Sequence, residues 1–133
     1  MNFIINTFFD LERAAEEIIS KSKYKIFTLN GNLGAGKTTL VKYLCKVLNC
    51  TDSVTSPTFS LVNEYLSTSG KIFHFDLYRI NYVEELFNIG FNEYIDSDNY
   101  CFIEWPSICE NELPEHHKIL LNLVDQTRYI TFN

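Results

Sequence analysis

The stretch GNLGAGKTT, residues 31–39, decides the expected fold of this chain. It matches the pattern G-x-x-x-x-G-K-[ST] in full, with Lys37 and Thr38 in the last two positions. An apolar run typical of a strand precedes it at residues 25–30, and an amphipathic helix is expected at residues 37–48. A glycine-rich turn in this setting lets backbone N–H groups surround a phosphate at the positive end of a helix dipole. The pattern therefore predicts a nucleotide-binding loop, and a chance glycine turn leaves the full match unexplained.

The positions of this loop have distinct expected roles. In such loops the lysine, here Lys37, reaches the β- and γ-phosphates, and the hydroxyl that follows, here Thr38, binds Mg²⁺. The remaining positions would surround the phosphates, and they are Gly31, Asn32, Leu33, Gly34, Ala35, Gly36 and Thr39. The loop therefore predicts a site for a nucleotide together with a divalent metal ion.

Two acidic residues are expected to complete the site, because each of them ends a strand. Glu104 closes the apolar run YCFIE at residues 100–104, directly before a Trp-Pro pair. Asp76 closes a second run in FHFDLYR, residues 73–79. Ligands of open α/β sheets bind at the carboxyl ends of the strands, so one acid could stand near the metal while the other orients an attacking water. A helix cap or a surface salt bridge is the alternative for each.

The rest of the chain predicts one α/β domain over residues 1–133. Further strands are expected at residues 2–6, 59–65, 71–75, 118–124 and 128–132, with hairpins around Ser69-Gly70 and Asp125-Gln126. We expect the fold of a P-loop NTPase, with a mixed, mainly parallel sheet, antiparallel hairpins and helices on both faces.

Local signals mark where two helices begin. Thr7 and Asp10 resemble a capping box that opens a helix near the start of the chain. Asn81 and Glu84 resemble a second capping box, and Gly90 is placed to end that helix. Both helices are expected to pack against the sheet.

Charge and composition limit the classes of function. The net charge is −6, and only three arginines occur, Arg13, Arg79 and Arg128. A protein that binds nucleic acid by itself normally presents a basic face. Any nucleic acid in the biology of this chain is therefore expected to be handled through a partner protein.

The expected location is the cytoplasm. The four cysteines form no C-x-x-C pair, and the three histidines show no zinc-ligand spacing relative to them. These features indicate reduced thiols in a cytosolic protein. The start MNFIINTFFDLER is apolar but lacks a basic leader, and no run approaches the length of a transmembrane span, so we expect no contact with membranes.

Five segments in a fixed order make the chain similar to a known family. They are GNLGAGKTT (31–39), TSPTFSLVNEY (55–65), HFDLYR (74–79), EELFNIGFNEYI (84–95) and CFIEWP (101–106). Together they resemble the TsaE family, also called YjeE, whose members are small P-loop ATPases of the bacterial machinery that makes threonylcarbamoyladenosine in tRNA. The similarity extends over residues 25–132.

The resemblance implies ATP and Mg²⁺ as cofactors and slow ATP hydrolysis by the free chain. It also implies TsaD and TsaB as partners. TsaD would transfer the threonylcarbamoyl group to adenosine 37 of tRNA, and the ATPase would support turnover of that complex. This chain would then meet tRNA only indirectly, which agrees with its acidic charge.

The resemblance further assigns residue roles. Glu104 would bind the metal together with Thr38, and Asp76 would be catalytic. Thr58 would act from a switch-like loop at residues 55–58, a position where GTPase-like folds sense the γ-phosphate. Trp105 would lie beside the site.

Two positions stand apart from that pattern. Family members commonly carry Asp where this chain has Asn32, which removes one negative charge next to the phosphates. Arg128 could reach the nucleotide from the last hairpin, and the alternative is a surface arginine at a strand end.

Three other functions also use a loop of this kind. A small-molecule kinase usually deploys several arginines around two polyphosphates, and this chain has three in all. A GTPase needs an N/T-K-x-D element for guanine, and no lysine here has that setting. A nucleotide-gated interaction module, in which binding and not turnover is the function, would use the same residues as an ATPase.

Overall fold

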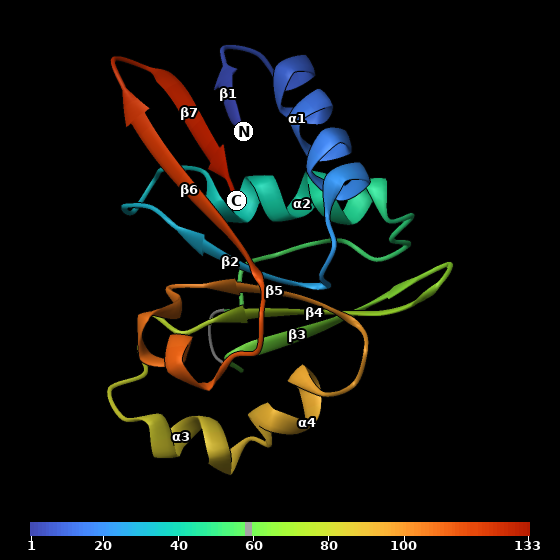
Figure 1. Cartoon of the computed structure of the whole chain (residues 1–133), viewed down its shortest axis with the longest axis vertical. Helices are drawn as coiled ribbons and strands as arrows, with labels where there is room; N and C mark the ends of the chain where they lie inside the picture. Colours follow the sequence, from blue (N-terminus) through green and yellow to red (C-terminus); the bar gives the residue numbers. More distant parts are fainter. Residues whose placement is uncertain (58–59) are drawn as a thin grey trace.

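The computed structural model describes residues 1–57 and 60–133, which form seven strands with helices around them (Figure 1). The strands are β1 (Asn2–Ile5), β2 (Ile26–Asn30), β3 (Val62–Ser67), β4 (Gly70–Asp76), β5 (Tyr100–Glu104), β6 (His117–Val124) and β7 (Thr127–Phe132). The helices are α1 (Phe8–Lys21), α2 (Lys37–Val47), α3 (Val83–Asn88) and α4 (Phe91–Ile95), with 3-10 turns η1 (Pro106–Ile108) and η2 (Glu110–Glu112).

The strands form one mixed sheet in the order β1-β7-β6-β2-β5-β4-β3. The central strands β6, β2, β5 and β4 run parallel, and antiparallel pairing adds β7 and β1 at one side and β3 at the other. Across the parallel centre, Leu29 lies in register with Glu104, and Glu104 with Asp76. The predicted mixed sheet with its hairpins is confirmed, and both acids stand at one edge of it.

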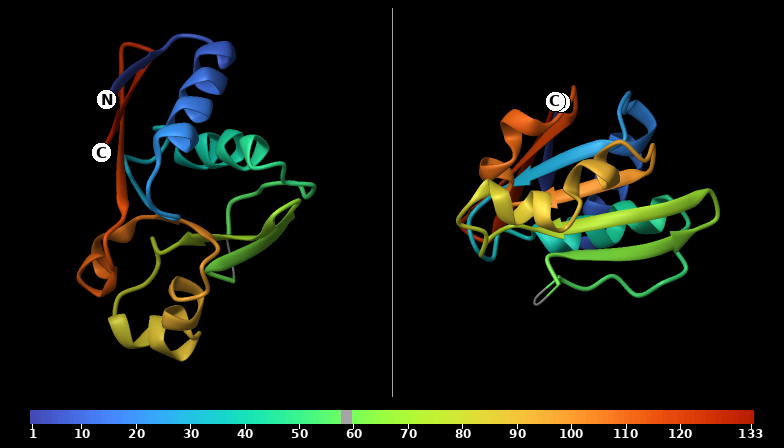
Figure 2. Two further views of the ribbon diagram at one scale, coloured as in Figure 1. Left: turned by 45° about the vertical axis from the view of Figure 1, so that its right-hand side comes forward. Right: turned by 90° about the horizontal axis from the view of Figure 1, so that it is seen from below.

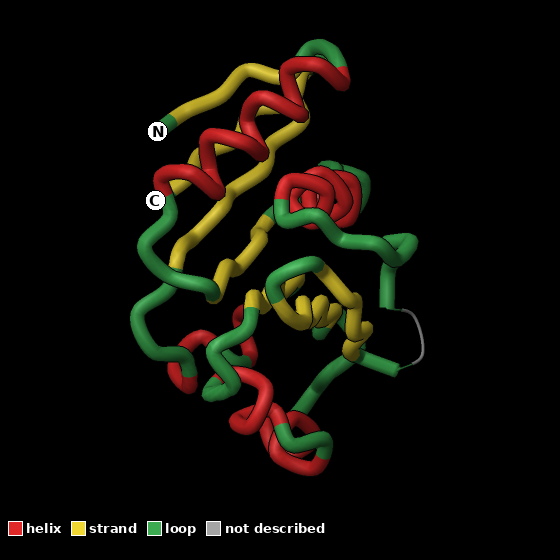
Figure 3. Tube along the Cα trace, turned by 90° about the vertical axis from the view of Figure 1, so that its right-hand side faces the viewer, coloured by secondary structure: helices red, strands yellow, loops and turns green. Residues whose placement is uncertain are grey.

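Alternating side chains divide the core between the two faces of the sheet, because successive residues of a strand point to opposite faces. In β4, Ile72 packs in the cluster that contains α1 and α2, whereas Phe73 and Phe75 pack in the cluster that contains α3 and α4. In β5, Phe102 lies in the first cluster and Ile103 in the second. Helices therefore cover both faces, as predicted (Figures 2 and 3).

The first helix begins as predicted, and the capping box expected at residue 81 is wrong by one position. Thr7 Oγ1 accepts from Asp10 N, and Asp10 Oδ2 accepts from Thr7 N, which completes the box of α1. At α3, by contrast, the Glu85 carboxylate accepts from the N–H groups of Asn81 and Tyr82. Tyr82 is the N-cap of that helix, so the residue three positions on is Glu85 and not Glu84.

Two of the predicted turns contain residues with positive φ. Gly90 follows the end of α3 with φ +76, as the sequence predicted for a C′ glycine. Asp125 and Gln126 both have positive φ between β6 and β7, which is the backbone of a tight hairpin turn. The strand expected at residues 59–65 begins later, at Val62. Thr58 and Phe59 lie outside the described residues.

The cysteines are buried or half-buried thiols. All four lie in the described part of the chain and are free, as the sequence indicated. Burial raises the pKa of Cys45, Cys101 and Cys109 to about 12, so these three are poor nucleophiles at neutral pH.

Among the described helices, none combines the length and apolar character that crossing a bilayer requires.

Phe27 in β2 tests the packing of this core. Its ring is fully buried and adjoins the rings of Tyr100, Phe102, His117 and Phe132. Phe27→Ala should lower the free energy of unfolding by about 3–5 kcal/mol in urea titrations, because it leaves a cavity in a packed interior. Phe9→Ala, at a ring that is 66% exposed, is the matched control and should change stability by less than about 0.5 kcal/mol. Equal effects of the two variants would contradict this core.

Candidate functional site

The glycine-rich loop joins the carboxyl end of β2 to the start of α2. A Cβ at Gly31 would stand 2.8 Å from the carbonyl oxygen of Leu121, so only glycine fits beside β6 there. Gly36 is the N-cap of α2 with φ +101, a conformation that L side chains rarely adopt. No side chain among the described residues caps this helix. Its first N–H groups therefore face the loop opening, which is the arrangement that binds anions.

Lys37 lies within that opening and is only 5% exposed. Its Nζ donates to the carbonyl oxygens of Gly31 (2.6 Å) and Asn32 (3.0 Å), and it stands 4.0 Å from the centre of the Trp105 ring. Burial lowers the pKa of Lys37, while two nearby carboxylates act in the opposite direction. An ammonium held this way attracts an anion more strongly than one in bulk water.

Trp105 is placed over Lys37 by an unusual backbone. It follows β5 with φ +56, which is rare and strained for a bulky residue and is found at functional sites. Its ring also packs against that of Tyr78, with the centres 4.8 Å apart. The family resemblance implied that Trp105 lies beside the site, and its ring lines the same cavity as Lys37.

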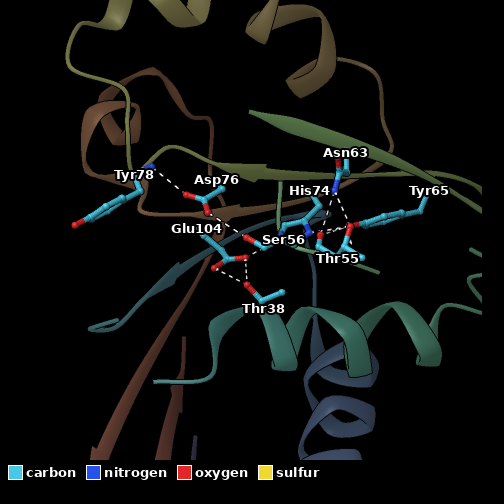
Figure 4. A network of polar contacts seen from close by, with 9 residues as sticks. All are labelled: Thr38, Thr55, Ser56, Asn63, Tyr65, His74, Asp76, Tyr78 and Glu104. Carbon is cyan, nitrogen blue, oxygen red and sulfur yellow. Dashed lines mark hydrogen bonds and ion pairs between the residues drawn. The ribbon is translucent and has the colours of Figure 1, made fainter. Parts of the chain in front are cut away.

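Glu104 is a buried carboxylate, 3% exposed, at the end of β5. Thr38 Oγ1, from the first turn of α2, lies 3.1 Å from Oε1 and 2.9 Å from Oε2 (Figure 4). His74 Nε2 lies 2.6 Å from Oε2. Burying a charge is costly unless hydrogen bonds satisfy it, and these two side chains do so. The structure thus joins the two residues that the sequence proposed for one metal.

His74 and Tyr65 are site residues that the sequence reasoning missed. His74, fully buried on β4, contacts Glu104 through Nε2 and the hydroxyl of Tyr65, 3.0 Å away, through Nδ1. The spacing of the histidines in the sequence bears only on zinc binding. The alternation of residues 73–76 held the missing signal, because it places His74 on the same face as Asp76.

Asp76 ends β4 next to Glu104, as the sequence indicated. Its Oδ1 accepts from Tyr78 N at 3.0 Å, and its Oδ2 accepts from Ser56 Oγ at 3.4 Å (Figure 4). Asp76 is therefore linked to the loop that precedes β3. Thr58, the residue proposed for the switch in that loop, lies outside the described residues.

Arg128 of β7 lies against the loop rather than pointing into solvent. A Cβ at Gly36 would stand 3.0 Å from Arg128 Nε. That Nε is buried and has no hydrogen-bond partner among the described residues. A buried donor without an acceptor is costly, and an anion held by the loop would satisfy it.

The loop, the acids and Arg128 surround one cavity of about 320 Å³. It is lined by Leu33, Gly34, Gly36, Lys37, Thr38, Thr39, Ser56, Asp76, Glu104, Trp105 and Arg128. Ala35 is buried in the core instead, and Gly31 and Asn32 contribute their carbonyl oxygens to Lys37. A cavity of about 390 Å³ lies beside α2 between Lys42 and Val54 and contains none of these groups. The polar site is therefore the smaller cavity.

The fold and the site define a class: an α/β protein with a parallel sheet centre and a glycine-rich, anion-attracting loop after its central strand. Within that class, the chain belongs to the TsaE family. The family model described as "Threonylcarbamoyl adenosine biosynthesis protein TsaE" matches residues 5–130. The family takes part in the biosynthesis of threonylcarbamoyladenosine in tRNA.

Individual relatives agree with this assignment. The chain is 44% identical to the tRNA threonylcarbamoyladenosine biosynthesis protein TsaE of Haemophilus influenzae, over 71% of this chain and 60% of that protein. It is 36% identical to the protein of the same name from Bacillus subtilis, over 80% of this chain and 68% of the relative. The crystal structure of Bacillus subtilis YdiB superposes with a TM-score of 0.76 at 28% identity, covering 99% of this chain and 83% of the other.

Lys37 gives the direct test of the anion site. For ATP, the anion that the family resemblance implies, Lys37→Ala should weaken binding by about tenfold to a hundredfold, because hydrogen bonds to charged groups contribute roughly 1.5–3 kcal/mol each. Isothermal titration calorimetry measures the change, with circular dichroism to verify folding. Lys46→Ala, an exposed lysine of the same helix, is the control. An ATP affinity unchanged by Lys37→Ala would remove the loop as the phosphate site.

Proposed function

We propose that this chain binds ATP with Mg²⁺ and hydrolyses it slowly as a subunit required for threonylcarbamoylation of adenosine 37 in tRNA. The observation that carries the proposal is the meeting of Thr38 Oγ1 with the buried Glu104 carboxylate beside the uncapped start of α2. A nucleotide-binding loop with a hydroxyl and an acid in this relation is the arrangement that holds a phosphate-bound metal. Membership of the TsaE family supplies the pathway.

The donors of the site suit the phosphates of ATP. The N–H groups at the start of α2 and the unpaired Arg128 Nε lack acceptors, and phosphate oxygens would provide them. Lys37 Nζ donates to two carbonyl oxygens and has a third proton for a phosphate oxygen. Arg128 thus takes the role of a nucleotide-binding residue, and the alternative of a solvent-facing arginine conflicts with its buried Nε. Asn32 adds no negative charge beside these donors.

The oxygen set of the site suits Mg²⁺. Thr38 and Glu104 would hold the ion, which keeps several waters and usually binds through one or two protein oxygens together with phosphates. No cluster of three or more acidic, histidine or cysteine side chains able to hold a metal occurs in residues 1–57 and 60–133. A site that depends on the nucleotide for its other ligands needs no such cluster. When bound, the metal neutralises charge on the phosphates.

Asp76 is the residue that we assign to the attacking water. Its two oxygens already accept one hydrogen bond each, from Tyr78 N and Ser56 Oγ, which fixes the carboxylate in direction. A carboxylate has further lone pairs, so it can accept a hydrogen bond from a water in the cavity. Thr58 is proposed to complete this part of the site from the neighbouring loop.

We further propose TsaD and TsaB as the partners and the cytoplasm as the location. A net charge of −6 does not favour direct contact with tRNA, so the partners would hold the nucleic acid.

A nucleotide-gated interaction module is the second candidate. The hydrogen bonds from Tyr65 and Asn63 to the carbonyl oxygen of Thr55 support it, because they connect the loop at residues 55–57 to the site. A small-molecule kinase is the weakest alternative, since Arg128 is the only arginine lining the described cavity.

Glu104 separates turnover from binding. Glu104→Gln and Glu104→Ala should both lower Mg²⁺-dependent ATP hydrolysis by more than about 100-fold. Losing an outer-shell partner of a metal costs up to about 100-fold, and Glu104 is proposed to hold the metal directly. ATP hydrolysis is measured for the purified chain with and without TsaD and TsaB. Glu16→Ala, at an exposed carboxylate on α1, is the control.

The outcomes distinguish the candidate functions. Hydrolysis that rises with the partners and disappears in both Glu104 variants supports the ATPase. Tight ATP binding without turnover in any condition would favour the interaction module. Transfer of phosphate to an added small molecule without partners would overturn both and support a kinase.

A further inference from the structure

A chain of buried hydrogen bonds connects the loop before β3 to the carboxylate of Glu104. Tyr65 OH lies 2.8 Å from the carbonyl oxygen of Thr55 and 3.0 Å from His74 Nδ1, and His74 Nε2 lies 2.6 Å from Glu104 Oε2 (Figure 4). Tyr65, His74 and Glu104 are all nearly inaccessible to solvent. The chain crosses β3, β4 and β5 and reaches α2 through Thr38.

His74 fixes the direction of the Glu104 side chain. Carboxylate oxygens accept and do not donate, so the nitrogen nearest to Glu104, Nε2, serves as the donor. Outer-shell donors of this kind hold the orientation of metal-binding carboxylates. The β4 backbone pairs with β5 on both sides of His74, and the imidazole is fully buried, so the ring has little room to move away from Glu104.

Tyr65 has one hydroxyl proton and two acceptors for it. When Tyr65 donates to His74 Nδ1, the Thr55 carbonyl oxygen still accepts from Asn63 Nδ2 at 3.1 Å. When Tyr65 donates to Thr55 instead, Nδ1 of a neutral His74 loses its donor. A movement of the loop at Thr55 therefore changes the hydrogen bonding of His74, which in turn contacts Glu104.

We propose that His74 and Tyr65 are positioning residues that set the orientation of Glu104 and couple it to the loop at residues 55–57. The inference rests on the proposed function, because it takes Glu104 as the acid that holds Mg²⁺. Neither residue touches the nucleotide in this proposal, so both act on the metal and on turnover. ATP binding by the glycine-rich loop is left largely unchanged.

A purely structural role is the alternative. A buried polar network can simply stabilise the pairing of β3 with β4. That role predicts lower stability for variants of Tyr65 and His74, with no change in the Mg²⁺ dependence of the site. The two roles thus differ in a property that stability does not affect.

The test uses variants that cut the chain at separate points. Tyr65→Phe removes the hydroxyl and keeps the ring. His74→Gln keeps a donor near the position of Nε2 but has no imidazole Nδ1, and His74→Ala removes both. Tyr24→Phe and His117→Gln are the matched controls. The Tyr24 hydroxyl contacts Glu115, and the buried His117 ring accepts from the backbone N–H groups of Lys23 and Tyr24. Tyr24 and His117 both lie away from the described cavity.

Two measurements are made on the full chain. The first is the Mg²⁺ concentration that gives half of the maximal effect on ATP binding. It is followed by the fluorescence of Trp105, the single tryptophan of the chain, whose ring lies against Lys37. The second is kcat and KM for ATP hydrolysis with the partner proteins of the proposed function. Unfolding in urea is recorded for each variant to separate stability from function.

His74→Ala should raise the required Mg²⁺ concentration or lower kcat by about 10–100-fold, with KM for ATP within about twofold of the wild type. His74→Gln should restore much of this loss. Tyr65→Phe should lower kcat in the wild-type background and have little further effect in His74→Gln, because the link is already broken there. The two control variants should keep the wild-type Mg²⁺ dependence.

Suppose that the wild-type chain binds and hydrolyses ATP. If His74→Ala and Tyr65→Phe then keep its Mg²⁺ dependence and its kcat, the positioning role alone is overturned. Independent, multiplicative effects of the two changes would overturn the coupling. A wild-type chain that binds ATP without hydrolysing it would overturn the proposed ATPase, while the Mg²⁺ titration would still decide the role of His74. A wild-type chain that binds no ATP would overturn both proposals.

Discussion

The burial of one negative charge organises this molecule. The Glu104 carboxylate sits at the end of a central strand, where little water reaches it, and a bare charge there would be strongly unfavourable. Donors arrive from two other elements, Thr38 at the start of α2 and His74 within β4, while the Lys37 ammonium stands nearby. The loop, the helix and two strands must therefore be in register with each other before the charge is satisfied. Fold and site are specified by the same contacts.

The parts of the fold that depend on local pattern could be predicted from the sequence. The strand, glycine-rich loop and helix around residues 26–47 were expected, as was the strand at residues 100–104, because apolar periodicity and glycines act over short distances. The capping box at α3 was displaced by one residue, since Glu84 and Glu85 are adjacent acids and only the backbone angle decides which one turns back. The short helix α4 was not anticipated as a separate element.

The site was predictable only as far as its motifs extend. Lys37, Thr38, Glu104 and Asp76 belong to recognisable patterns at the ends of elements, and the sheet brings them together. Strand alternation puts His74 on the face of Asp76, but its contact with Glu104 depends on the parallel register of β4 against β5. The contact of Tyr65 with His74 depends on the antiparallel register of β3 against β4. Arg128 is a similar case, because its approach to Gly36 follows from the position of β7 and not from neighbouring residues. Thr58 stays a prediction.

The pairing of β1 with β7 has a consequence for the order in which the molecule is assembled. During synthesis β1 can pair only after β7 has emerged, because β7 is its partner in the sheet. Contacts between such distant segments form slowly, since the intervening chain must first be brought together. Arg128 is carried by β7. The nascent chain therefore holds its glycine-rich loop and both acids well before the arginine that lies against the loop, so the contact of Arg128 with the loop depends on a long-range approach of β7.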